Sequence, residues 1–129
     1  MLENVDITTL EARKSLAKMI MKLFSLWGLG VADRLALLGL GPEYQNMLVR
    51  YAMGDPLPNS QDMQDRVSRL LSIHKLLRIL YPHNRDLVYS WIKSRNKAFN
   101  NSTPLEIMFE ENLSGFDRIV DYLRFYASM

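Results

Sequence analysis

Few residues in the chain have the type and spacing that metal binding requires. The two histidines, His74 and His83, are nine residues apart, and neither has a second histidine or a carboxylate at i+4 on the same helix face. His74 lies among leucines, which favours a core or interface histidine hydrogen-bonded to a neighbour. His83 follows a proline and is predicted to lie in a loop. We therefore expect no metal site.

An acidic cluster near the C-terminal end offers the other candidate chemistry. Glu106 and Glu110 share a helix face, with Glu111 beside them, and paired carboxylates can act as general acid and base. No nucleophile motif accompanies them, and solvated surface is far more common for this spacing. The absence of cysteine excludes a thiolate nucleophile, a thiolate metal cluster and a disulfide framework, and it fits a reducing cytosol. The sequence therefore predicts a cytoplasmic protein without catalytic residues or a cofactor.

Two Gly-Leu-Gly segments, 28–30 and 39–41, look like half of a dinucleotide fingerprint. No strand precedes them and the third glycine is missing, so nucleotide binding is not expected. Glycine just past a helix end adopts the left-handed conformation cheaply, and Pro42 suits the first turn of a helix. These residues therefore predict a short helix over 31–38, a tight turn and a second helix from Pro42 to about Met53, which is a helix-turn-helix candidate.

Helical spacing of apolar residues runs through the rest of the chain, and it predicts an all-α, compact multi-helix protein. The length of 129 residues and the apolar fraction of 48% suit a compact folded protein. A first helix from about Thr9 to Trp27, capped by Thr8 or Thr9, has one apolar stripe that is predicted to be buried: Leu16, Met19, Ile20, Leu23, Phe24 and Trp27.

The segment Gly54–Asn59 contains two prolines and a glycine, and it is the clearest break in the helical pattern. We expect it to join two domains, residues 1–56 and 57–129. Within the second, Asp62 and Arg66 form an i, i+4 pair that is worth a few tenths of a kcal/mol on an exposed face. The predicted helices of this half span 60–80, 84–94, 103–112 and 114 onward.

Charge is unevenly distributed although the net charge is only +2. Residues 1–59 hold six basic and six acidic side chains, residues 66–97 hold eight basic against one acidic, and residues 98–129 hold two basic against five acidic. This pattern suggests self-association or a charged partner, with solvated faces as the alternative. The longest uncharged run, 23–32, is ten residues long, too short for a membrane span of about 20.

The second helix of the helix-turn-helix candidate carries polar side chains suited to DNA. Gln45, Asn46 and Arg50 have the chemistry to contact adenine, guanine or phosphate. Residues 1–59 are neutral overall, and phosphate neutralisation supplies most non-specific affinity. DNA binding would therefore need dimerisation or further cations, and a helical packing module without DNA is the alternative. The cations in question are Arg66, Arg69, Lys75 and Arg78.

The second half resembles a known family. Trp91 is followed by Phe99 and then, after four residues, by Pro104-Leu105-Glu106. With the leucine-rich helix before it and Val120 to Leu123 after it, this pattern is similar to the toxin-binding domain of the Xre/MbcA/ParS antitoxins. These are small helical proteins encoded beside toxins of the RES-domain type. The resemblance covers about residues 57–126.

In that family an Xre-like helix-turn-helix precedes the toxin-binding domain. Residues 38–41 and 50–54 look like its turn and its Arg-Trp-x-x-Gly end. The interval from Gly39 to Tyr51 is a few residues longer than in the family, and Leu35 stands where a small residue is usual. Asn100-Asn101 replaces a glycine-containing turn, and asparagine tolerates the left-handed region better than other non-glycine residues.

The resemblance implies a non-enzymatic antitoxin of a type II toxin–antitoxin system. It would bind and neutralise a RES-domain, NAD-degrading toxin, repress its own operon through operator DNA, and form a homodimer or larger oligomer. The expected toxin-binding residues come from the motif, the outer sides of the last helix and the chain end. They are Phe99, Asn100, Pro104, Leu105, Glu106, Tyr122, Phe125, Tyr126 and Met129.

Two alternatives remain open at the level of sequence. One is a helix-turn-helix transcriptional regulator without a toxin, and the other is a helical oligomerisation adaptor. The aromatic residues of the last helix can equally pack against the first half or a second copy of the chain. Truncating residues 122–129 is expected to abolish toxin neutralisation while leaving the helical fold.

Overall fold

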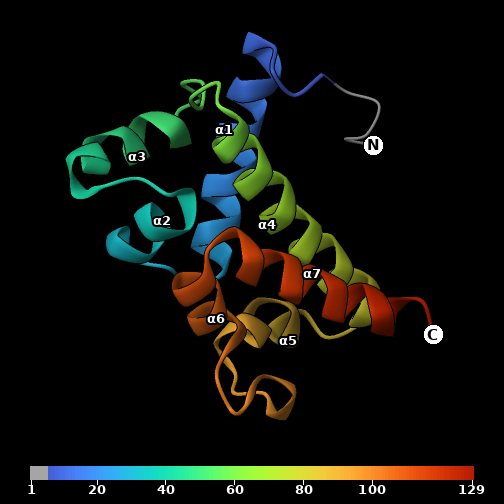
Figure 1. Ribbon diagram of the computed structural model, residues 1–129. Coiled ribbons are helices and arrows are strands. Elements are labelled where there is room, and N and C mark those ends of the chain that lie inside the picture. Colours follow the sequence, from blue (N-terminus) through green and yellow to red (C-terminus); the bar gives the residue numbers. More distant parts are fainter. Residues whose placement is uncertain (1–5) are drawn as a thin grey trace. The chain divides into compact units, whose positions relative to one another are not determined.

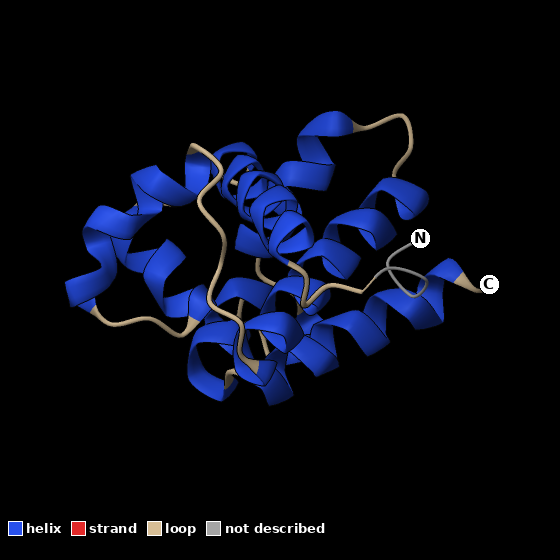
Figure 2. Cartoon of the chain, turned by 90° about the horizontal axis from the view of Figure 1, so that it is seen from above, coloured by secondary structure: helices blue, strands red, loops and turns tan. Residues whose placement is uncertain are grey.

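The computed structural model describes residues 6–129 and consists of helices joined by turns (Figures 1 and 2). Within this range there is no β-strand, only one isolated antiparallel bridge between Asn96 and Ser102. The all-α prediction is confirmed. No helix in the described range is long and apolar enough to span a membrane. The elements are α1 (Leu10–Leu26), α2 (Val31–Leu38), η2 (Pro42–Tyr44), α3 (Gln45–Ala52), α4 (Gln61–Leu80), α5 (Arg85–Ser90), η3 (Trp91–Lys93), η4 (Lys97–Phe99), α6 (Pro104–Glu111) and α7 (Leu113–Ala127).

Side-chain caps fix where four of these helices begin. The side chains of Thr9, Ser60, Asn84 and Thr103 each accept a hydrogen bond from the backbone N–H three residues later. At Thr103 the cap is reciprocal, because Glu106 accepts in turn from the Thr103 backbone N–H. Each such bond satisfies a donor that the first helical turn leaves unpaired. The helix starts predicted from these residues are confirmed.

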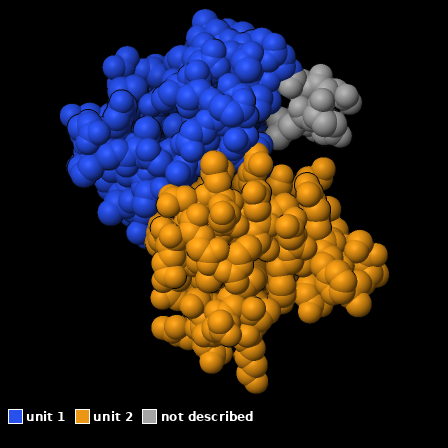
Figure 3. Space-filling model, viewed as in Figure 1, with its two compact units in different colours: residues 1–68 blue, residues 69–129 orange. Residues whose placement is uncertain are grey.

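The chain divides into two compact units, unit 1 with residues 1–68 and unit 2 with residues 69–129 (Figure 3). The division falls inside α4, which begins in unit 1 and ends in unit 2. The segment 54–59 is non-helical, as predicted, and lies within unit 1. Its Leu57 is 2% exposed and accepts a hydrogen bond from the Arg13 side chain at 3.1 Å. The assignment of separate functions to residues 1–56 and 57–129 stays a prediction.

Helix α1 supplies more buried side chains to unit 1 than any other helix of that unit. The predicted burial of one residue in the apolar stripe is wrong, because Met19 is 48% exposed. Ala17 and Met21 are buried in its place. Both lie on the opposite flank of the stripe, so the buried face of α1 is rotated away from Met19. The sequence period defines which residues share a face, but the packing partners decide where that face is centred.

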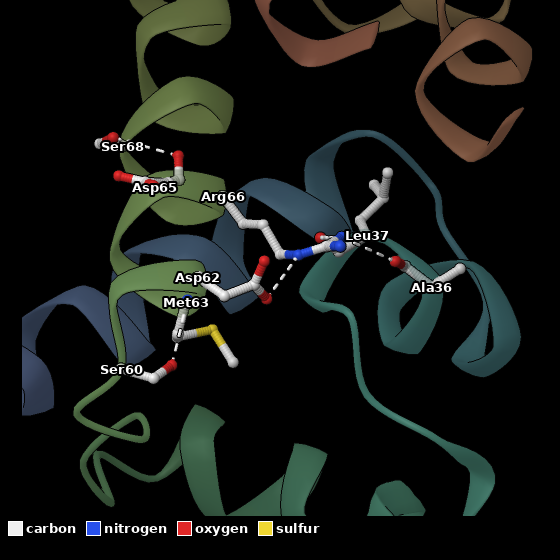
Figure 4. A network of polar contacts seen from close by, with 8 residues as sticks. All are labelled: Ala36, Leu37, Ser60, Asp62, Met63, Asp65, Arg66 and Ser68. Carbon is white, nitrogen blue, oxygen red and sulfur yellow. Dashed lines mark hydrogen bonds and ion pairs between the residues drawn. The ribbon is translucent and has the colours of Figure 1, made fainter. Parts of the chain in front are cut away.

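A buried arginine closes the end of α2 (Figure 4). Arg66 is 8% exposed, and its Nη1 donates to the carbonyl oxygens of Leu37 at 3.2 Å and Ala36 at 3.4 Å. Its Nε lies 2.9 Å from Asp62 Oδ2. The i, i+4 pair is therefore present, but its prediction as an exposed-face pair is wrong for Arg66. The last carbonyls of a helix lack intrahelical donors, and the guanidinium supplies them.

Gly39 makes this arrangement possible. It ends α2 with φ +69°, in the left-handed region that the sequence predicted. A Cβ at this position would lie 2.7 Å from the Arg66 guanidinium. Between Gly39 and Tyr51, the chain forms the short turn η2 ahead of α3.

Unit 2 is organised around the helix pair α6 and α7. Gly115 is buried, and a Cβ there would lie 2.5 Å from the Ile107 carbonyl oxygen, so glycine allows close contact between the two helices. The predicted inward residues Phe116, Ile119 and Leu123 are each at most 1% exposed. In the turn after Phe99 the structure confirms the left-handed conformation predicted there, at both asparagines, Asn100 and Asn101.

Candidate functional site

Aromatic rings form a continuous cluster in unit 2. Tyr122 of α7 lies at its centre, with its ring centroid 6.0 Å from that of Trp91 in a stacked arrangement and 5.0 Å from that of Phe99. Tyr126, one turn later on α7, lies 4.9 Å from Tyr122, and Phe125 meets Tyr126 edge-on at 5.2 Å. The cluster thus joins η3, η4 and α7.

The two ends of this cluster differ in exposure. Trp91 and Phe99 are 7% and 5% exposed, whereas Phe125 and Tyr126 are 61% and 46% exposed. Met129, the last residue, is 85% exposed. We call Phe125, Tyr126 and Met129 the aromatic tip. Tyr126 packs on the half-buried Tyr122, which packs in turn on the buried Trp91 and Phe99. The rings of the tip therefore present apolar area in a restricted geometry, which lowers the entropy cost of a contact.

The residues expected to bind toxin fall into two groups. Phe99, Pro104 and Leu105 are buried, so they shape the surface from beneath. Tyr122 is half-buried, and the other five reach solvent: Asn100, Glu106, Phe125, Tyr126 and Met129. The structure brings Phe99, Tyr122, Phe125 and Tyr126 into one cluster. Their role in binding stays a prediction.

The expectation about truncation needs correction. Leu123 is 1% exposed, and Tyr122 packs on Trp91 and Phe99. Deleting residues 122–129 would therefore remove core contacts as well as surface. A deletion that starts at Phe125 removes exposed side chains and the last turn of α7, and it is the better test of the tail.

Two glutamates of the cluster, Glu106 and Glu111, are engaged in structural contacts. Hydrogen bonds from Thr103, chiefly from its backbone N–H, hold the pKa of Glu106 below its ordinary value. Glu106 Oε1 also lies 3.7 Å from Arg95 Nη1, and Glu111 pairs with Arg118. Among residues 6–129 there is no group of three or more histidines, aspartates or glutamates placed to hold a metal ion. These carboxylates therefore act as helix caps and ion-pair partners.

His74 is half-buried, and its Nε2 lies 2.9 Å from the Tyr89 hydroxyl. The prediction of a histidine hydrogen-bonded to a neighbour is confirmed. Burial lowers the pKa of His74, and the nearby positive charges of Arg78 and Arg85 lower it further. The imidazole is therefore neutral at physiological pH.

Helix α3 presents all three residues that were predicted to contact DNA. Gln45, Asn46 and Arg50 are exposed. Sequence reasoning missed that Arg50 Nε lies 2.6 Å from Asp55 Oδ2, a pair that forms across the end of the helix and has no helical spacing. It also missed two exposed apolar side chains on or just after α3, Val49 at 66% and Met53 at 76%.

Comparison with known proteins places the C-terminal part in a family. Residues 76–125 match the antitoxin Xre/MbcA/ParS C-terminal toxin-binding domain. The chain is also 31% identical over 97 residues to the uncharacterized protein y4oB of Sinorhizobium fredii (strain NBRC 101917 / NGR234). That similarity covers 75% of this chain and 72% of y4oB. No solved structure matches the chain.

Proposed function

Because the chain belongs to the Xre/MbcA/ParS antitoxin family through its C-terminal toxin-binding domain, we propose that it binds a toxin protein and holds it inactive. The toxin that we propose is a RES-domain protein that degrades NAD. In this proposal the antitoxin catalyses no reaction. It acts by covering the partner's active site.

The aromatic tip is the observation that carries this proposal. Aromatic residues and methionine are enriched at protein interfaces, and buried aromatic anchors contribute most of the binding free energy. Phe125 is the last residue of the matched family region and Tyr126 follows it directly, and both are exposed large apolar side chains, as is Met129. A partner that covers them removes this apolar area from water.

The charge of the C-terminal part also supports contact between this end of the chain and the toxin's active site. Residues 98–129 carry five acidic and two basic side chains. A cleft that binds a dinucleotide must carry cationic or N–H donor groups for its phosphates. The acidic C-terminal end can meet those groups, so the antitoxin would exclude the substrate both sterically and electrostatically.

A co-expression experiment tests this function. The chain is produced with the product of the neighbouring gene, and a tag on that product is used for purification. We expect wild-type chain to copurify and to relieve growth arrest. The double substitution Phe125→Ala with Tyr126→Ala should weaken binding at least about tenfold, because truncating an interface anchor typically costs 2 kcal/mol or more.

Val49→Ala is the matched control, since it also removes an exposed apolar side chain, but from unit 1. It should leave toxin binding unchanged. If the neighbouring product is harmless alone and does not copurify with wild-type chain, the antitoxin function is wrong. If it copurifies equally with the double variant, the aromatic tip is not the contact surface.

We also propose that unit 1 binds operator DNA and represses the operon. The exposure of Gln45, Asn46 and Arg50 on α3 supports this role. The ion pair with Asp55 engages Arg50 Nε, while the remaining guanidinium N–H groups stay available as donors. The neutral charge of residues 1–59 makes a single copy a weak DNA binder, so we propose that a homodimer binds.

Operator binding at low salt tests this second role. Arg50→Ala should weaken binding by about 1–3 kcal/mol, whereas Lys22→Ala, which removes an exposed cation of α1, should have little effect. Absence of binding by wild-type chain at low salt would remove the repressor role. DNA binding without any toxin binding would favour a transcriptional regulator, and oligomerisation alone would favour an adaptor.

A further inference from the structure

A surface pocket of about 350 Å³ lies in unit 2, where the end of α4 turns into α5. All of its lining residues fall within the region that matches the toxin-binding family. Two of them are arginines and two are tyrosines. The lining residues are Arg78, Tyr81, Pro82, Arg85, Val88 and Tyr89.

The two arginines of the pocket lack acidic partners. Within residues 6–129 neither Arg78 nor Arg85 lies within ion-pair distance of a carboxylate, and Arg85 instead lies over the Tyr89 ring, 4.9 Å from its centroid. Five other arginines of the chain are paired with aspartate or glutamate, and Arg13 and Arg34 donate to backbone carbonyl oxygens; the five are Arg50, Arg66, Arg69, Arg95 and Arg118. The pocket therefore holds two guanidinium groups whose positive charge is not neutralised nearby.

The positive charge of Arg78 and Arg85 also acts on His74, which is hydrogen-bonded to the lining residue Tyr89. Burial lowers the pKa of that histidine, and the two charges help to lower it. The surrounding stretch 66–97 has eight basic side chains and one aspartate. An anionic group entering the pocket would gain favourable electrostatic energy with both guanidinium groups.

We propose that this pocket receives a carboxylate side chain from the surface of the toxin, held by Arg78 and Arg85 and flanked by the rings of Tyr81 and Tyr89. This inference rests on the proposed antitoxin function. A guanidinium matches a carboxylate in planar, two-point geometry. In a pocket open to solvent a free small anion stays hydrated and screened, whereas an interface excludes water around the same contact and strengthens it.

The contact would give the complex its orientation. The C-terminal third of the chain is acidic and the pocket is basic. A complementary partner therefore needs basic groups opposite the first and an acidic group opposite the second. A toxin with a basic cleft and an acidic side chain elsewhere can satisfy both in one arrangement. Complementary charges of this kind suppress wrong arrangements and speed association.

Binding constants for the purified toxin, the product of the neighbouring gene, test the pocket. Arg78→Ala and Arg85→Ala should each raise the Kd about tenfold or more, because truncating one partner of a buried charge pair costs over 2 kcal/mol. Lys75→Ala is the matched control, since it removes an exposed cation of α4 that does not line the pocket. It should change the Kd by less than about threefold. Both arginines are exposed, so thermal unfolding should show that the variants fold normally.

The arginine-to-lysine variants separate geometry from charge. Arg78→Lys and Arg85→Lys keep the positive charge but lose the planar fork, so we expect them to bind more weakly than wild type. If wild-type chain does not bind the toxin at all, the proposed function is wrong, and the pocket inference fails with it. If wild type binds and both alanine variants behave like Lys75→Ala, only the pocket inference is overturned.

A titration of the chain alone with sodium phosphate and with sodium acetate completes the test. We expect no saturable NMR shift of the Tyr89 or His74 signals at submillimolar concentration. Saturable binding of phosphate, combined with unchanged toxin affinity in Arg78→Ala, would show that the pocket serves a free anion. That outcome would overturn the proposal.

Discussion

Arg66 of unit 1 and the pocket arginines Arg78 and Arg85 of unit 2 are used in opposite ways. In unit 1, Arg66 is 8% exposed, is paired with Asp62 and donates to the end of α2. In unit 2, Arg78 and Arg85 are exposed and have no carboxylate partner among residues 6–129. All three belong to the same basic stretch, 66–97. A run of like charge is therefore not one solvated face, and each cation has to be assigned its own role.

The difference between the buried Arg66 and the exposed Arg78 and Arg85 predicts which substitutions lower the free energy of unfolding and which weaken binding to a partner. A buried cation with several partners contributes to the free energy of unfolding, because its removal leaves buried acceptors without donors. An exposed, unpaired cation contributes little to stability and remains available for a partner.

Arg66→Ala should have the largest effect on stability. We expect a loss of about 3 kcal/mol in the free energy of unfolding, since the Ala36 and Leu37 carbonyls lose their side-chain donor. Hydrogen exchange should show loss of protection first in α2. Arg78→Ala should change stability by less than about 0.5 kcal/mol. Equal losses in the two variants would contradict the contrast between the units.

Gly39→Ala should cost about 2 kcal/mol. The position has φ +69°, which a residue with a Cβ adopts at a penalty of about 1–2 kcal/mol, and the added Cβ would press on the Arg66 guanidinium. Urea unfolding measures the loss. In the double variant with Arg66→Ala the contact term disappears, so the combined cost should be less than the sum. Strict additivity would mean that the contact with Arg66 contributes nothing.

Thr103→Ala removes the reciprocal cap of α6 and should cost about 1 kcal/mol. The matched substitution in unit 1 is Thr9→Ala, where the cap has only one side-chain hydrogen bond. We expect the smaller loss there. The pKa of Glu106 should rise only part of the way toward its ordinary value in Thr103→Ala, because the contribution of the Thr103 side chain is lost while the backbone N–H, the chief cause of the lowering, remains. An unchanged pKa, measured by NMR titration, would contradict this explanation.

The smallest effect concerns pH and His74. Its pKa in the folded chain lies below the ordinary value of 6.5, so the unfolded chain takes up the proton first as pH falls. Stability is therefore fully present above about pH 6.5 and decreases as pH falls toward the folded pKa. Melting curves between pH 7.5 and about 5 should show this decrease, and His74→Gln should reduce it. An equal decrease in the variant would assign the effect to other groups.

The sequence predicted the local features of the fold well, because they depend on neighbours within a few residues. The caps at Thr9, Ser60 and Thr103, the left-handed turn at Gly39 and the two left-handed asparagines all follow from residue type and position. The burial of Arg66 could not be predicted, since it depends on carbonyls some 30 positions away in the chain. The exposure of Met19 has a similar origin, because packing partners select the buried face.

The candidate site was predicted in part. The motif around Phe99 and the aromatic residues of α7 were found in the sequence, but their assembly through Tyr122 onto Trp91 needed the fold. The pocket of Arg78 and Arg85 was missed because nothing in their spacing distinguishes an unpaired cation from a paired one. The only sign of the pocket in the sequence is the charge of residues 66–97, which hold eight basic side chains and one acidic side chain, Asp86.

We propose that the chain acts by binding a toxin through unit 2. The most direct test of this proposal is the Kd between the purified chain and the neighbouring gene's product, for wild type, the Phe125→Ala with Tyr126→Ala variant and Val49→Ala. We predict tight binding by wild type and Val49→Ala and at least about tenfold weaker binding by the double variant. Absence of binding by wild-type chain would contradict the account.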